Sequence, residues 1–149
     1  MQRIFYFSLR ERLEALLKLP QFVKLLQFEF CRPRPRNRNI MTDVFDAPGW
    51  RAHMGEASLP CRRIGLQLCS DGFQAFNCGS LSLKPVVEMI LSLSPAKRTK
   101  SEYMLLHMLL PPGVKNLSQK KYFDFAATFE MNSLWHEGKN FSEQCMNLF

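Results

Sequence analysis

Arginine at every second position is the feature of this sequence that most directly suggests binding chemistry. The stretch Cys31–Asn39, called here the arginine segment, sets its arginines between prolines and asparagines: Arg32, Arg34, Arg36 and Arg38. Two prolines within four residues exclude a helix interior and predict an extended, solvated backbone. Guanidinium groups along such a backbone suit the phosphates of a nucleic acid, and a flexible charged linker is the alternative interpretation.

A carboxylate follows a predicted strand in the middle of the chain. Apolar residues occupy every second position over residues 62–70: Ile64, Leu66 and Leu68. This period of two predicts a strand, which Asp71-Gly72 ends. Aspartate before glycine is common in turns, so Asp71 taken alone predicts a turn more readily than a functional carboxylate.

Cysteine and histidine show no spacing that would form a metal or redox site. The five cysteines are irregularly placed and include no C-x-x-C pair, which speaks against a zinc ribbon and predicts free thiols. The histidines at His53, His107 and His136 are far apart in the sequence. Because His107 lies inside an apolar run, we expect it to be a buried residue with its polar atoms satisfied rather than a ligand.

The overall composition predicts a single basic domain. The chain has 149 residues, 46% of them hydrophobic, and a net charge of +7. This charge favours a nucleic acid as partner, with an anionic membrane surface second and an ordinary basic protein as the alternative. Beyond the arginine segment, further phosphate contacts are expected from basic side chains in the second half: Lys97, Arg98, Lys100, Lys120 and Lys121. We find neither a secretory signal nor an uncharged apolar run long enough to span a bilayer, which predicts no membrane partner.

The elements that must position these residues can be read from apolar periodicity and from helix-ending residues. Two helices are predicted before the arginine segment, the first capped by Ser8 and Glu11 and the second beginning after Pro20. A short helix capped by Asp46 follows it. Three strands come next, and then a helix. Their predicted ranges are 62–70, Pro85–Leu93 and Tyr103–Leu110 for the strands, and Ser118–Gly138 for the helix.

Several short segments stand in an order and spacing similar to those of a known family. They are Ile64–Phe73 with its Asp-Gly-Phe end, Lys84-Pro85-Val86-Val87, Leu109–Gly113 and Glu130–Gly138. With the Asp-Val-Phe-Asp-x-x-x-Trp pattern of Asp43–Trp50, they resemble the En/Spm-like (CACTA-type) transposases from about Phe5 to Gly138. The chain departs from the family pattern at Lys84, where tryptophan is usual, and at Gln74-Ala75-Phe76, which lacks the usual proline.

The resemblance implies a catalytic core like that of ribonuclease H, whose first elements are also strand–strand–strand–helix. Such cores transfer phosphoryl groups with two Mg²⁺ or Mn²⁺ ions held by three acidic side chains. Asp71 takes the place of the first of these carboxylates. The other two belong to later elements, so we expect an incomplete metal site, no bound cofactor and no DNA cleavage or transfer by this chain alone. Four other acidic residues are expected to be solvated surface charges: Glu88, Glu102, Asp124 and Glu130.

The sequence therefore predicts an α+β fold with N-terminal helices followed by an incomplete ribonuclease H-like half-core. Its predicted parts are a helical and basic segment over 1–60, the partial core over 61–138 and a frayed tail over 139–149. We expect a nuclear or cytoplasmic protein, not a secreted one, that binds DNA through phosphate contacts. An open sheet edge at Ile64–Ser70 predicts self-association. The alternative is a protein-interaction module, or a transposon relic, with a surface formed by this edge and by Phe22, Phe28 and Phe30.

Overall fold

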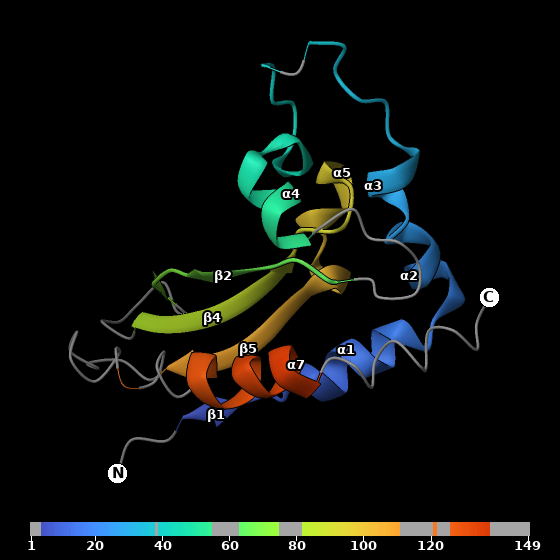
Figure 1. Ribbon diagram of the computed structural model, residues 1–149. Helices are drawn as coiled ribbons and strands as arrows, with labels where there is room; N and C mark the ends of the chain where they lie inside the picture. Colours follow the sequence, from blue (N-terminus) through green and yellow to red (C-terminus); the bar gives the residue numbers. More distant parts are fainter. Residues whose placement is uncertain are drawn as a thin grey trace.

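The computed structural model describes residues 4–37, 39–54, 63–74, 82–110, 121 and 126–137. Its centre is an antiparallel sheet with strands in the order β1-β5-β4-β2, and β3 pairs with β4. The strands are β1 (Phe5–Tyr6), β2 (Leu66–Ser70), β3 (Phe73–Gln74), β4 (Ser82–Ile90) and β5 (Met104–Leu110). Helices flank this sheet (Figure 1), so the predicted α+β class is confirmed.

The segments β2 and β3 form one interrupted arm of a hairpin with β4. Ser70 pairs with Val86 and Phe73 pairs with Leu83, and this shared register places Asp71 opposite Pro85. Proline has no N–H to donate, and the ladder is broken at this point. Asp71 therefore lies at a break inside the hairpin arm. The strand predicted to open at Pro85 begins three residues earlier, at Ser82, and ends at Ile90.

The helices are short, and the first residues of α1 and α2 follow the signals read from the sequence. They are α1 (Leu9–Leu17), α2 (Pro20–Leu25), α3 (Phe28–Cys31), η1 (Val44–Asp46), α4 (Pro48–Met54), α5 (Pro95–Arg98), η2 (Ser101–Tyr103), the π-helical η3 (Ala126–Met131) and α7 (Asn132–Glu137). The Ser8 side chain accepts a hydrogen bond from the N–H of Glu11 and caps α1, as predicted. Pro20 stands in the first turn of α2, where its missing N–H is harmless. The predicted start of the last helix and the tail 139–149 lie outside the described residues.

One hydrophobic core joins the N-terminal helices to the sheet. Its buried members come from α1, α2, β4, β5 and the residues after β4: Leu9, Leu13, Leu17, Phe22, Leu26, Ile90, Leu93 and Leu105. Leu134 of α7 packs against the same core. A smaller cluster of Val86, Met108 and Leu110 lies on the sheet with Ile4 and Leu68 at its margin. The two parts predicted over 1–60 and 61–138 thus contribute to a common core.

Gly65 allows α4 to approach the start of β2. A Cβ atom at this position would lie 2.7 Å from Cζ3 of Trp50 and nearer still to its Cη2. The Trp50 ring is buried and held by its Nε1–H, which donates to Glu29 Oε1 at 2.9 Å. We expect Gly65→Ala to destabilise the fold by roughly 1–3 kcal/mol in urea unfolding, because the ring has to shift. Gly49→Ala is the matched control, since a Cβ there meets nothing within 4 Å. Equal losses in both variants would contradict this close approach.

Candidate functional site

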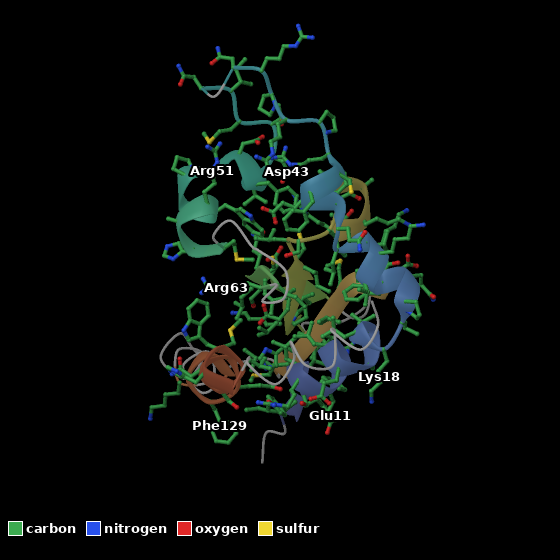
Figure 2. The ribbon with its side chains drawn as sticks, turned by 45° about the vertical axis from the view of Figure 1, so that its right-hand side comes forward. Glu11, Lys18, Asp43, Arg51, Arg63 and Phe129 are labelled. Carbon is green, nitrogen blue, oxygen red and sulfur yellow. The ribbon has the colours of Figure 1, made fainter. Side chains whose placement is uncertain are left out.

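The arginine segment connects α3 to η1 and projects away from the rest of the molecule (Figure 1). Figure 2 shows side chains around this projecting backbone. Arg34 and Arg36 are exposed, and Arg38 lies outside the described residues. The backbone around the two prolines is neither helix nor strand, as the sequence predicts.

An ion pair between Arg32 and Asp46 closes the base of the projecting segment. The two side chains are 7% and 5% exposed. Asp46 Oδ2 also accepts hydrogen bonds from the N–H and the hydroxyl of Thr42 at 2.9 and 2.8 Å. The Arg32 guanidinium holds the pKa of Asp46 well below its usual range, and the bonds from Thr42 act in the same direction against the opposing effect of burial. Asp46 thus joins Arg32 at the start of the segment to Thr42, which lies just beyond its end, whereas the sequence had suggested Asp46 as the cap of the following helix.

A second ion pair, between Arg98 and Asp43, ties this base to α5. Arg98 Nη2 lies 2.6 Å from Asp43 Oδ1, and its Nε donates to the carbonyl oxygens of Leu91 and Leu93 at 2.9 Å each. The guanidinium carbons of Arg98 and Arg32 lie 5.0 and 5.2 Å from the centroid of the Phe45 ring. We call Arg32, Asp46, Asp43 and Arg98 the ion-pair cluster. The two aspartates of the Asp-Val-Phe-Asp pattern, Asp43 and Asp46, therefore have a structural role in this cluster.

The basic residues predicted to contact phosphate differ in whether their charge is paired and in how exposed their side chains are. Arg32 and Arg98 are paired with carboxylates in the ion-pair cluster. Arg34, Arg36, Lys100 and Lys121 are exposed, and Lys97 is half-buried with its Nζ 6.0 Å from the Tyr103 ring centroid. Lys120 lies outside the described residues. Within the described part of the arginine segment, the exposed positive charge therefore comes from Arg34 and Arg36.

Asp71 is exposed, and its Oδ1 accepts a hydrogen bond from the N–H of Gly72 at 2.7 Å. Within the described ranges, no three side chains of the types His, Cys, Asp and Glu come together in a way that could hold a metal ion. Two divalent ions need several carboxylates in fixed geometry, so the residues placed by the structure do not fit the predicted Mg²⁺ or Mn²⁺ site. Cys31 and Cys69 are free thiols.

A buried charge network is formed by Glu88 on β4, His107 on β5 and Glu130 on η3, and it extends to Tyr6 on β1, which is 42% exposed. His107 is the extra residue of a β-bulge, because Val86 pairs with Met108 while Val87 pairs with Leu106. Its ring is fully buried between two carboxylates. Nδ1 lies 3.2 Å from Glu88 Oε1, and Nε2 lies 3.2 Å from Glu130 Oε2. The second contact has the length of an ion pair, but it is not aligned as a hydrogen bond.

Glu130 connects this network to the segment that leads into α1. Its Oε1 accepts from the Ser8 hydroxyl at 3.0 Å and from the Arg10 N–H at 2.8 Å, and its Oε2 accepts from the Tyr6 hydroxyl. Burial pushes the pKa of Glu130 upward, but the bonds from Arg10, Tyr6, Leu9 and Ser8 together hold that pKa below its usual value. Burial and the adjacent carboxylate raise the pKa of the Tyr6 phenol. Glu130 is therefore ionised and Tyr6 is neutral near pH 7.

The predictions for the acidic residues can be compared with these positions. Glu88 and Glu130 are 0% and 6% exposed, so the prediction that both are solvated surface charges is wrong. Each finds a partner that is distant in the sequence, and this compensates for part of the desolvation. Glu102 is exposed, as predicted, and Asp124 lies outside the described residues. A usable signal was present in Glu88 and His107, since each is the one polar residue within an apolar run, over 85–91 and 104–110 respectively.

Comparisons with known proteins return no match: no family model, no curated protein and no solved structure is similar to this chain. The resemblance to En/Spm-like transposases therefore stays a prediction that rests on the motifs quoted above. Among the described helices, none is long and apolar enough to cross a bilayer.

Proposed function

We propose that this chain binds the phosphate backbone of duplex DNA without sequence preference, through the arginine segment. In this proposal the sheet and its following helix are a partial ribonuclease H-like core of the En/Spm-like kind. The chain by itself does not cleave or transfer DNA, because Asp71 alone cannot fix two metal ions.

The strand arrangement supports the proposed relationship at the level of topology. The strands β2, β4 and β5 are antiparallel neighbours in chain order, and the helical segment Ala126–Glu137 follows them. This is the strand–strand–strand–helix order that the resemblance implies. Asp71 follows the first of these strands, where the family places its first carboxylate.

The observation that carries the proposal is the projection of Arg34 and Arg36 from a base that is fixed by ion pairs. Asp46 bonds to Arg32 before the projecting residues and to Thr42 after them. Fixing the two ends reduces the conformational freedom that DNA binding would otherwise have to remove. Guanidinium groups are suited to phosphate because their planar donors match its oxygens.

The test is duplex DNA binding by the full chain across a salt series. We expect the logarithm of the association constant to fall linearly with the logarithm of the salt concentration. Arg34→Gln with Arg36→Gln is expected to reduce the magnitude of this slope by about 2, since each lost phosphate contact removes about one released ion. Lys18→Gln with Lys24→Gln is the matched control. It removes the same charge from exposed positions after α1 and in α2, and Figure 2 places Lys18 at the end of the molecule opposite the arginine segment.

Two results would contradict the proposal. Equal slopes for the two double variants would show that net charge, and not the arginine segment, governs binding. Mg²⁺-dependent cleavage of DNA that disappears in Asp71→Ala would show that the chain is an enzyme.

Absence of DNA binding even at low salt would favour the alternative, self-association through β2. Among the described strands, β2 pairs only with β4 and leaves its other side without a strand partner. Backbone groups on such an edge can pair with a second chain. The predicted sticky aromatic surface is wrong for Phe22, which is 1% exposed in the core, whereas Phe30 is 46% exposed.

A further inference from the structure

The buried charge network joins parts of the chain that are far apart in the sequence. Glu130 bonds to Tyr6, Ser8 and the backbone of Arg10, residues that precede it by 120 to 124 positions. His107 contacts Glu130 from the sheet side and Glu88 within the sheet. The docking of the helical segment Ala126–Glu137 on the sheet therefore involves a titratable ring that is fully buried.

The charge state of the His107 ring decides how its two nitrogens interact with the carboxylates beside them. A neutral imidazole has one donor nitrogen and one acceptor nitrogen, whereas an imidazolium donates from both. Both nitrogens of His107 face carboxylate oxygens at 3.2 Å. Glu130 is ionised and accepts hydrogen bonds from Ser8, Tyr6 and the Arg10 N–H, so it has no proton to offer to a neutral ring. A protonated ring would direct an N–H toward each carboxylate, whereas a neutral ring with its proton on Nδ1 keeps only the hydrogen bond to Glu88.

The other charged groups around the network also bear on the charge of the ring. From α1, the Arg10 guanidinium donates to Ser133 Oγ at 2.9 Å, and Arg12 Nη1 donates to the carbonyl oxygen of Leu106 at 2.8 Å. From β1, the neutral Tyr6 ring lies with its centroid 5.5 Å from that of His107. The two arginines oppose the charge on His107. The two carboxylates favour it and contact the ring directly.

We propose that His107 is a pH-sensitive switch whose proton holds the helical segment Ala126–Glu137 on the sheet. When the proton is lost, one ring nitrogen becomes an acceptor. The hydrogen bond from Nδ1 to Glu88 is the better aligned contact, so the proton that remains stays there. The lone pair of Nε2 then faces the ionised Glu130. Glu88 is fixed in a central strand, and the repulsion is relieved by movement of Glu130 and its helix away from the sheet.

Amide hydrogen exchange of the full chain between about pH 5 and about pH 8 tests this switch, since histidine changes charge in that interval. After correction for intrinsic exchange, protection of the amides in residues 126–137 is expected to fall as the pH rises. The fall is at most about tenfold per pH unit, the limit for one linked proton. In His107→Gln this dependence should be absent. His53→Gln and His136→Gln are matched controls, because both histidines are exposed, and they should keep it.

A second measurement covers the case in which His107→Gln does not fold. The ring carbon and nitrogen chemical shifts of His107 in the unmodified chain report its charge directly by NMR. We expect an imidazolium at the low end of the interval, and its loss should coincide with the fall in protection. A neutral ring throughout, or protection that does not change with pH, would overturn the proposal. So would a pH dependence that disappears in His136→Gln.

Discussion

Replacing His107 with leucine is expected to destabilise the fold by roughly 3–5 kcal/mol, the range for removing one partner of a buried ion pair. The substitution is costly because it leaves the Glu88 carboxyl group without its hydrogen-bond partner. This carboxylate is 0% exposed, its Oε2 has no hydrogen-bond partner, and its Oε1 is bonded to His107. Without the imidazole it would be a buried carboxyl group with no compensating partner. Urea unfolding followed by circular dichroism measures the loss.

A double variant separates the loss of charge compensation from the loss of packing. His107→Leu combined with Glu88→Met removes both members of the pair and keeps apolar volume in the core. We expect it to recover most of the stability, since Glu130 keeps its bonds from Ser8, Arg10 and Tyr6. His53→Leu, at an exposed position, should change stability by no more than about 0.5 kcal/mol. A loss in His107→Leu as small as that in His53→Leu would show that Glu88 needs no partner.

Phe22→Ala is expected to reduce the free energy of unfolding by roughly 3–5 kcal/mol, the usual loss for a buried phenylalanine. Phe22 belongs to the core formed with Leu9 and Leu13, and its ring stacks on Tyr103 with the centroids 5.9 Å apart. Removal of the ring opens a cavity between α2 and the end of the sheet. The measurement is the shift in the thermal or urea midpoint.

Phe30→Ala is the matched control on the neighbouring helix α3. The sequence places both phenylalanines in one candidate surface, but Phe30 is 46% exposed. We expect its replacement to cost about 1 kcal/mol or less. Equal losses in the two variants would contradict the packing of α2 against the sheet.

The elements that the sequence predicted well are those whose signals are local. The cap at Ser8, the interruption of the helical pattern at Pro20 and the apolar run ending at Leu110 all depend on residues within one turn or one strand. β1 was missed because two residues are too few for a periodic pattern, and it is a strand only through its pairing with β5. The short helix α5 was not predicted either, since four residues are too few to show a helical period.

The candidate site was harder to predict because its partners are distant in the sequence. The alternation of arginine and proline identified an exposed, extended segment, which Arg34 and Arg36 confirm. The same pattern could not show that Arg32 pairs with Asp46 or that Arg98 pairs with Asp43, since the choice of partner is made by tertiary structure. Likewise, Glu88 and Glu130 resemble surface charges until His107 is placed between them.

The position of β1 at the edge of the sheet beside β5 affects the order in which the chain can fold. β1 is the first of the five strands to be synthesised, but Phe5 pairs with Leu109 and Tyr6 with Met108, in the last of them. That pairing closes a loop of about a hundred residues, whose entropy must be lost before the contacts are gained. The hairpin of β2, β3 and β4 is local and can form earlier. We infer that β1 and α1 dock late, on a sheet whose central strands are already paired.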